Sequence, residues 1–463
     1  MTETSTKLNP KDLATITVLI VSAFVVILNE TIMNVALPVL MHEFQVSEEA
    51  IQWLATIFML TMAVVIPATG FLLQRFSTRG VFMLAMGLFS LGTLLAAAAP
   101  GFSLLLAARV IQASGTAIMM PLLMTTILDL VPANRRGVIM GNVSIVISVA
   151  PAIGPTISGL ILHSLSWRYM FLIVAPIALA ALFIGAPRLN KVAEASKMPL
   201  SIPSVILSVP AFGGLVFGLS RLSANGLDAE TLVVLVVAVM ALVVFTMLQL
   251  RLQKNDHALL DLRTFTYRPF TLSLSLMVLA MVALFGVIIL LPLYLQNVRG
   301  LDTLATGLML LPGGLLMGLL APFVGRLFDK VGPRPLMIPG TVILTGVLFG
   351  YSRLLGAETA IGVIIGLHLT MSLALALIFT PAFTTALNPL PHSLHSHGSA
   401  VLSTLQQLGG AAGTALLVGV LASRIAPGPR PGSIRSRPRS TGSPPDSLWP
   451  RSAPRAWSSL PRS

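Results

Sequence analysis

Arg109 is a charged residue inside an apolar stretch, Leu104–Met120, that is long enough to cross a bilayer. Insertion scales assign an arginine at mid-membrane a cost of roughly 2.5–3.5 kcal/mol, so such a residue normally faces a bundle interior or an aqueous cavity. Gln112, three residues later, shares its helix face. The small residues Ala113 and Gly115 allow another helix to approach beside the guanidinium. Two roles are open: Arg109 works in transport, or it only ties helices together.

The first apolar stretch carries a carboxylate in the segment LNETIMNVALP, Leu28–Pro38. Glu30 and Asn34 are four residues apart and share a helix face, with Asn29 beside them. A carboxylate in apolar surroundings can load and release a proton near neutral pH, as a proton-coupled carrier requires. The alternative places Glu30 near an outer mouth, where it is only solvated. Asp129, at the inner end of the fourth apolar stretch, is the next candidate for the proton.

A proline- and glycine-rich segment, APAIGPTISG, lies in the fifth apolar stretch. Prolines remove backbone donors and kink a helix, and glycines allow close helix contact. The segment therefore predicts a bent, tightly packed helix that controls leak between two halves of a bundle. Its residues are Pro151, Gly154, Pro155 and Gly159.

The composition indicates the bundle that must position these residues. The 463-residue chain is 55% hydrophobic and 10% charged, with a mean hydropathy of +0.90, which excludes an ordinary soluble protein. We predict an all-α polytopic membrane protein with thirteen spans, each able to cross roughly 30 Å of hydrocarbon. The spans are Leu13–Leu37, Ile51–Leu73, Gly80–Ala99, Phe102–Leu128, Val138–His163, Tyr169–Ala186, Leu200–Leu219, Leu232–Leu252, Phe270–Leu295, Ala305–Leu327, Pro335–Leu355, Thr359–Ala386 and His397–Ser423.

The distribution of basic residues predicts the topology. With a cytoplasmic N-terminus, sixteen Lys and Arg fall in inner segments, and four, Arg168, Arg221, Arg299 and Arg353, fall in outer loops. This positive-inside bias predicts a multi-pass protein of the cell (inner) membrane. The acidic segment His42–Glu49 is predicted as an outer loop. Topology also explains the net charge of +13, so no nucleic-acid partner is expected.

A weak internal repeat predicts two related halves. GFLLQRFSTRG (Gly70–Gly80) ends the second span, and GRLFDKVGPRP (Gly325–Pro335) ends the tenth. Duplicated bundles of this kind place a substrate site near the bilayer midplane. We predict that these segments control the conformational change, through Gly70, Arg75, Arg79, Gly325, Asp329, Gly332 and Arg334.

The repeat also divides the chain into predicted domains. These are a six-helix bundle at 1–187, a two-helix insert at 188–255, a five-helix bundle at 256–423 and a Pro/Arg/Ser-rich tail at 424–463. The tail holds eight arginines and one aspartate and should be disordered. It is either a natural flexible tail or, as we expect from its abrupt change of composition, a frame-shifted end that replaces a last helix.

Sequence signatures of enzymes are missing. There is no HExxH, GxSxG or Walker motif, so neither an enzyme nor an ATP-driven pump is expected. PHSLHSHGS (Pro391–Ser399) has three histidines at metal-like spacing, but it lies in a predicted inner loop without carboxylates or cysteines. We therefore expect no metal site and no cofactor; the candidate titratable carboxylate Glu30 favours a proton gradient as the energy source.

These motifs together resemble the fourteen-span drug:proton antiporters of the major facilitator superfamily (EmrB/QacA type), over roughly Leu13–Ser423. LNETIMNVALP is similar to the family's first-span signature, with Asn29 at the usual aspartate position. RVIQASGTA (Arg109–Ala117) is similar to the fourth-span signature, where the arginine is associated with proton coupling. The two loop motifs, APAIGPTISG and QQLGGAAGTAL (Gln406–Leu416) also match, with Gln74 replacing an acidic residue. The QRFSTR form and Asn29 resemble the lincomycin-exporting branch.

The resemblance implies proton-coupled efflux of lipophilic or cationic drugs by alternating access, hence antibiotic resistance. Arg109, Glu30 and Asp129 would carry proton coupling, and Asn29, Asn34 and Gln112 would line the substrate cavity. The implied partners are a small-molecule drug, protons and the lipid bilayer; a monomer is compatible with the sequence. The alternatives are an exporter of a specific metabolite or lipid precursor, and a truncated membrane protein that does not transport.

Overall fold

The computed structural model describes residues 9–189, 201–301, 303–356 and 358–425, except for the side chains of residues 34, 225, 297, 303, 304 and 418–425. Within these ranges every regular element is a helix, which confirms the predicted all-α class. The main helices are α1 (Pro10–Phe44), α2 (Glu48–Arg75), α3 (Thr78–Ala97), α4 (Phe102–Leu130), α5 (Arg136–Ser164), α6 (Arg168–Gly185), α7 (Ile202–Ser208), α8 (Gly214–Asn225), α9 (Ala229–Leu252), α10 (Arg268–Asn297), α11 (Thr303–Val331), α12 (Arg334–Leu354), α13 (Ile361–Leu387) and α14 (His395–Ile425).

Each predicted span coincides with a helix or a helix pair. In the described part of the chain, twelve helical segments are long and apolar enough to cross a membrane. The thirteenth predicted span forms α14, a continuous helix that is not among those twelve. The protein is therefore a multi-pass membrane protein. The predicted tail lies outside the described residues from 426 onward.

One predicted boundary is wrong, and one predicted span is not a regular helix. The acidic segment predicted as a loop from His42 is still helical until Phe44, and the chain reverses only at Gln45, whose φ of 53° is left-handed. The seventh span is not one regular helix, because α7 and α8 are joined by a π-helical turn at Val209–Gly213. Pro210 has no backbone N–H to donate within a helix, and such a defect is a common site of a local π turn.

Local capping explains several helix ends. The Ser47 and Ser77 hydroxyls each accept a backbone N–H, from Ala50 and Gly80, at 3.2 Å. The Asp228 carboxylate accepts the Thr231 N–H at 2.7 Å. These residues satisfy donors that the first turn of a helix leaves free, so α2, α3 and α9 begin where the sequence provides an oxygen.

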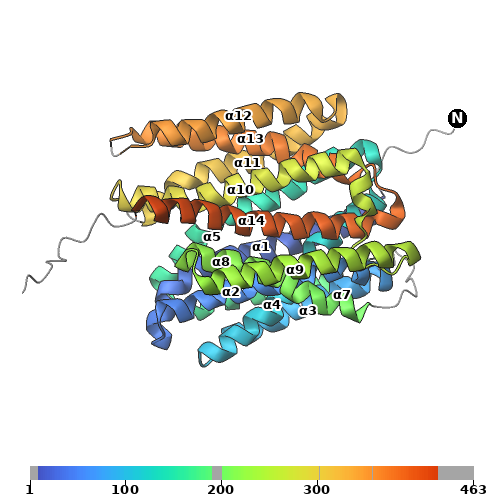
Figure 1. Ribbon diagram of the computed structural model, residues 1–463, viewed down its shortest axis with the longest axis horizontal. Helices are drawn as coiled ribbons and strands as arrows, with labels where there is room; N and C mark the ends of the chain where they lie inside the picture. The colour runs from blue at the N-terminus through green and yellow to red at the C-terminus, as the bar shows by residue number, and fades with distance from the viewer. Residues whose placement is uncertain (1–8, 190–200, 302, 357, 426–463) are drawn as a thin grey trace, which may run out of the picture. The chain divides into compact units, whose positions relative to one another are not determined.

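We call α1–α6 the first half and α10–α14 the second half. In Figure 1, α12 and α13 lie side by side in the second half, α8 lies beside α2, and α9 lies beside α8. The ring of Phe217 on α8 lies 5.7 Å from that of Trp53 on α2. The helices α7–α9 thus pack on the outside of the first half; their status as an insert in a repeat stays a prediction.

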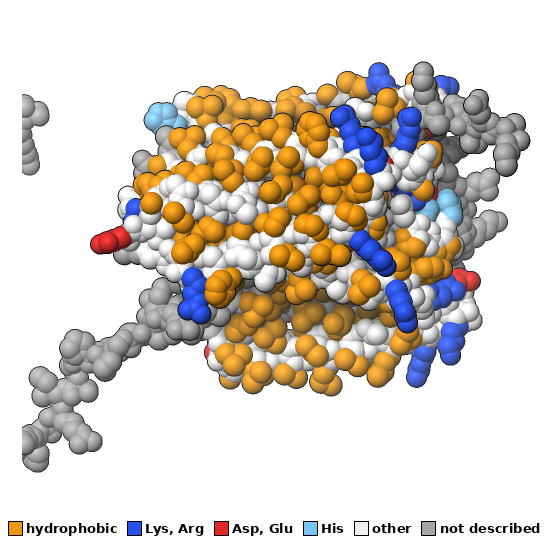
Figure 2. All heavy atoms as spheres, turned by 90° about the horizontal axis from the view of Figure 1, so that it is seen from above, with side chains coloured by type: hydrophobic (Ala, Val, Ile, Leu, Met, Phe, Trp, Pro, Cys, Tyr) orange, Lys and Arg blue, Asp and Glu red, His pale blue; other side chains and the backbone are white. Residues whose placement is uncertain are grey.

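The surface separates an apolar middle from a basic end. Figure 2 shows hydrophobic side chains over the middle of the face it presents and most Lys and Arg gathered toward one end. Exposed apolar residues such as Met240 on α9 belong to this belt. We define the basic end as the end of the helices that carries Arg75, Arg135, Lys254, Arg326 and Lys330. Such a belt is expected where helices face lipid.

The two halves meet most closely from the basic end to the middle. Along α5, Gly137, Gly141 and Ala152 face Gly325, Ala321 and Gly314 of α11, in that order. A Cβ added at Gly141 would lie 2.6 Å from the Ala321 carbonyl oxygen. Because small residues allow backbones to approach, α5 and α11 close their side of the basic end in this conformation.

Candidate functional site

The Arg109 guanidinium lies buried in the first half, with 1% of the residue exposed. Its Nε donates to the Leu54 carbonyl oxygen at 3.3 Å, and a terminal nitrogen donates to Gln112 Oε1 at 2.7 Å. The guanidinium carbon lies 3.9 Å from the centre of the Phe58 ring, where a cation is attracted by the negative ring face. The arginine and glutamine thus share a face, as their spacing predicted.

A short polar chain holds Gln112 in turn. Gln112 Nε2 donates to Thr93 Oγ1 at 2.8 Å, and Thr93 Oγ1 donates to the Phe89 carbonyl oxygen at 2.7 Å. A Cβ added at Gly92 would lie 2.5 Å from the Gln112 backbone nitrogen, so this glycine lets α3 approach α4. In this conformation Gln112 is fully buried and positions Arg109. Its place in a substrate cavity stays a prediction.

Glu30, on α1, is the acidic residue predicted to act together with this arginine. It is partly buried on α1, and its carboxylate interacts electrostatically with Arg109. In the described part of the chain Glu30 forms no direct ion pair. Asn29 beside it is 2% exposed, and its Oδ1 has no hydrogen-bond partner among the described residues. The Asn34 side chain lies outside the described residues.

The proline- and glycine-rich segment contacts α1. Gly154 faces Thr31 so closely that a Cβ would overlap the Thr31 side chain. Four residues later Ser158 Oγ donates to the Ile32 carbonyl oxygen at 3.0 Å. Pro151 and Pro155 lie inside α5, which stays continuous. A Cβ at Gly159 would meet no atom within 4 Å, so only part of this motif makes close contacts.

The motif that ends α11 caps a helix of the other half. The two Asp329 carboxylate oxygens each accept a backbone N–H at 3.0 Å, from Gly137 and Val138 at the start of α5. One turn away, Gly325 faces Gly137 backbone to backbone. Gly332 has a left-handed φ of 79°, which favours glycine, and α12 begins at Arg334. A carboxylate at a helix N-terminus is stabilised by its free N–H groups and dipole.

The corresponding motif after α2 makes a weaker contact. Gln74 Nε2 donates to the Ser393 carbonyl oxygen at 3.2 Å, just before α14. A Cβ at Gly70 would lie 3.2 Å from His397 Nδ1. Arg75 ends α2, and Arg79 lies in the first turn of α3. Because an amide replaces the carboxylate, Gln74 cannot provide the charged cap that Asp329 provides on the other side.

Asp329→Asn should weaken closure of the basic end, because the charge on the cap is lost while the side-chain shape is kept. We expect a cost of about 0.5–2 kcal/mol, or roughly two- to thirtyfold in the population of the open form. The chain has no cysteine, so Ser144→Cys provides a single reporter. Ser144 is buried and accepts from Thr380 across the two halves at 2.8 Å. Its rate of thiol labelling should rise by that factor.

Asp228→Asn is the matched control for this experiment. Asp228 also caps a helix, but its partner Thr231 belongs to the same helix, α9. Its substitution should leave labelling of the reporter unchanged. A labelling rate that is the same in both variants as in the parent would contradict the role of Asp329 in closure.

Asp129 lies apart from Arg109 and Glu30. It is twenty residues beyond Arg109 on α4, or roughly 30 Å along the helix. Its Oδ1 lies 3.0 Å from His395 Nδ1 and 3.3 Å from His392 Nε2, both from the second half. The histidine segment itself contains no carboxylate, but the fold brings Asp129 of α4 beside it. No sequence signal could connect these residues, because 266 positions separate Asp129 from His395.

A cavity of about 1000 Å³ opens beside this cluster at the basic end. The loop between α9 and α10 forms one of its walls. There Arg263 Nε donates to both Asp261 oxygens, at 3.0 and 2.8 Å, and its terminal nitrogen pairs with Asp256. The hydrogen bonds to Asp261, and then those to Asp256, raise the pKa of the Arg263 guanidinium above its usual value.

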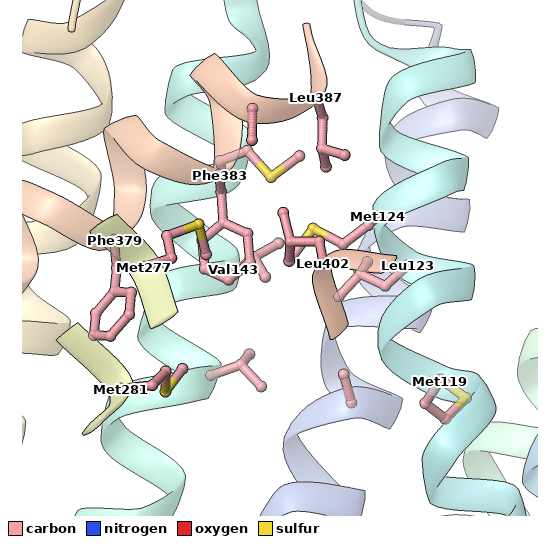
Figure 3. Close-up of a cluster of buried hydrophobic side chains, with 14 of the residues drawn as sticks. Met119, Leu123, Met124, Val143, Met277, Met281, Phe379, Phe383, Leu387 and Leu402 are labelled. Atoms are coloured by element: carbon pink, nitrogen blue, oxygen red, sulfur yellow. The ribbon is translucent and has the colours of Figure 1, made fainter. Parts of the chain in front are cut away.

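An apolar cluster lies between the halves, on the basic-end side of the middle. Figure 3 shows its side chains, which come from α4, α5, α10, α13 and α14; the methionines belong to α4 and α10 and the phenylalanines to α13. All are buried, with at most 7% of any one exposed. Methionine side chains are flexible and adapt to irregular shapes. The cluster comprises Met119, Leu123, Met124, Val143, Met277, Met281, Phe379, Phe383, Leu387 and Leu402.

Comparison with known proteins agrees with this geometry. Residues 19–414 match the family model described as Major Facilitator Superfamily. The chain is 42% identical to YcnB of Bacillus subtilis, an uncharacterized MFS-type transporter, over 88% of this chain and 86% of that one. It is 41% identical to lincomycin resistance protein LmrB of Listeria innocua, over 87% and 85%. The crystal structure of the human organic anion transporter MFSD10 has the same fold, with a TM-score of 0.65 at 14% identity, covering 89% and 94%. The family match over most of the chain and the identity with these relatives show that the chain belongs to the major facilitator superfamily of transporters.

Proposed function

We propose that this protein is a proton-coupled exporter of lipophilic or cationic drugs, lincosamide antibiotics among them, that works by alternating access. The observation that supports this class of substrate is the 41% identity with a lincomycin resistance protein over most of both chains. The methionine-rich apolar cluster supports it, because opening of the basic end would present an adaptable apolar surface to varied substrates.

The proposed direction of transport rests on charge. The basic end would face the cytoplasm in the inner membrane, by the positive-inside rule. Because that end is closed, the conformation described would be the outward-facing one. Entry of substrate from the cytoplasm would require the α5–α11 contact and the Asp329 cap to separate.

The proposed coupling uses Glu30 and Arg109. A proton on Glu30 would remove its attraction to the guanidinium, which Gln112 and Leu54 hold in place. Loss of this attraction would shift α1 relative to α2 and α4. Such a charge change is a differential interaction of the kind needed to bias two conformations.

The function is tested by expression in a host that lacks its own drug pumps. We expect resistance to lincomycin and efflux of a lipophilic cation, both abolished by an uncoupler. Efflux that persists without a proton gradient would contradict coupling. Normal membrane abundance with no efflux of any tested drug would favour a carrier of one specific metabolite instead.

Glu30→Gln should flatten the pH dependence of efflux while substrate binding is kept, because the amide has a similar shape but cannot be ionised. The measurement is drug exchange and gradient-driven efflux in proteoliposomes across a range of internal pH. Glu43→Gln is the control, since Glu43 lies near the C-terminal end of the same helix and pairs with Arg168 at 3.8 Å. An unchanged pH profile in Glu30→Gln would assign the proton to another group.

A further inference from the structure

Two histidines and one aspartate meet at the basic end with ligand atoms within 4.8 Å of one another. His392 begins a 3-10 turn that ends at Leu394, and His395 begins α14. Side chains three residues apart eclipse in a 3-10 turn, which places the two imidazole rings side by side, with centres 5.4 Å apart. Asp129 comes from the other half of the molecule, at the end of α4.

The hydrogen bonds of His395 decide which of its nitrogens is free. His395 Nε2 lies 3.2 Å from the Leu390 carbonyl oxygen, which can only accept, so this nitrogen carries a hydrogen. In the neutral ring Nδ1 then has a lone pair, and it faces the Asp129 carboxylate at 3.0 Å. Two acceptors at this distance repel unless a positive charge lies between them.

A metal ion would also account for this arrangement. His392 Nε2 approaches the same carboxylate oxygen at 3.3 Å. Protons on the two rings could satisfy these contacts as well, so the case for an ion rests on the spacing of the ligand atoms. In a tetrahedral zinc site with bonds of about 2.0–2.1 Å, neighbouring ligand atoms are about 3.3 Å apart. Both measured separations from Asp129 are close to that value.

The surroundings also agree with a metal site. Ligand histidines usually donate their second N–H to a carbonyl oxygen or carboxylate, as His395 does to Leu390. The nearby Arg136 interacts with Asp129 only through its charge, because its nitrogens donate to Val131, Leu128 and Asn388 and leave the carboxylate oxygens open to an ion. His392 is 79% exposed in its side chain, so an ion has access from the cavity, while Asp129 and His395 are largely buried.

We propose that Asp129, His392 and His395 bind one first-row transition-metal ion, such as Zn²⁺. The ion would link the two halves at the closed basic end. Imidazole ligands favour such metals over Mg²⁺ and Ca²⁺, which prefer oxygen. Because Asp129 belongs to the first half and both histidines to the second, opening of the basic end breaks the site. The bound ion therefore stabilises the closed form.

The test uses the purified full-length chain, treated with a chelator and free of any polyhistidine tag. Titration with Zn²⁺ should reveal one site per chain that excess Mg²⁺ does not displace, and Co²⁺ should give the visible spectrum of a tetrahedral site. His392→Gln and Asp129→Asn should each weaken binding by about tenfold or more. His257→Gln, an exposed histidine of the neighbouring loop, should bind as the parent does.

A second measurement tests the link between the halves. With the Ser144→Cys reporter, Zn²⁺ should slow thiol labelling in the parent chain but not in Asp129→Asn. The exposed His392 contributes little to packing, so thermal unfolding without metal should be unchanged in His392→Gln. Absence of a stoichiometric site, or binding unaffected by His392→Gln, would overturn the proposal, and Zn²⁺ binding without slower labelling would overturn its action on closure.

Discussion

Arg109→Ala is expected to reduce proton-driven drug efflux to the level of cells without the transporter, while the chain still inserts into the membrane. Removal of a buried charge makes insertion easier. It also leaves Gln112 Oε1 without its donor, at about 1–3 kcal/mol for a buried group, whereas the Leu54 carbonyl oxygen keeps its backbone hydrogen bond within α2. The measurement is uncoupler-sensitive efflux, normalised to membrane abundance.

Two comparisons separate a coupling role from a structural one. Arg109→Lys keeps the charge but loses the planar fork of donors that contacts both partners, so it should rescue poorly. Drug exchange without a proton gradient should survive in Arg109→Ala if the residue acts in coupling. Loss of exchange together with low abundance would mean that Arg109 only ties α4 to α2, and normal gradient-driven efflux would contradict both roles.

The helices and the local pairs could be predicted because their signals are local. Apolar stretches of about twenty residues determine each span, and a three-residue spacing was enough to place Gln112 beside Arg109. The exceptions are also local: Pro210 disrupts its span through a missing N–H, and Gln45 ends α1 with a left-handed turn.

The contacts between the halves could not be predicted, since nothing in one sequence connects residues so far apart. The Asp329 cap joins positions separated by 192 residues, and the Asp129–His395 contact joins positions separated by 266. The sequence assigns Asp329 to conformational control but does not indicate its partner at the start of α5. The sequence favours Asp129 as a proton carrier and gives no indication of a metal site at the histidines, because only the fold brings the carboxylate and the imidazoles together.

Gly325→Val should stop transport by preventing closure of the basic end. The nearest atoms to a Cβ at this position are the backbone carbonyl group of Gly137 and the Cα of Val138, the latter at 3.3 Å. Backbone atoms at the start of α5 cannot move aside as a flexible side chain could, and Asp329 holds the same turn. We expect efflux to fall to background and the Ser144→Cys reporter to be labelled faster than in the parent chain.

Gly307→Val separates this clash from the cost of a β-branched residue in α11. It lies in the same helix, but a Cβ there meets no atom within 4 Å, so both transport and labelling should stay near the parent values. Gly325→Ala should lie between the two, since one methyl group already requires α5 and α11 to separate. The order of labelling rates among these three variants therefore reports how closely the α5 and α11 backbones must approach when the basic end closes. Normal efflux by Gly325→Val would mean that the transporter works without this contact, and closure would then depend on the α4–α14 side of the basic end.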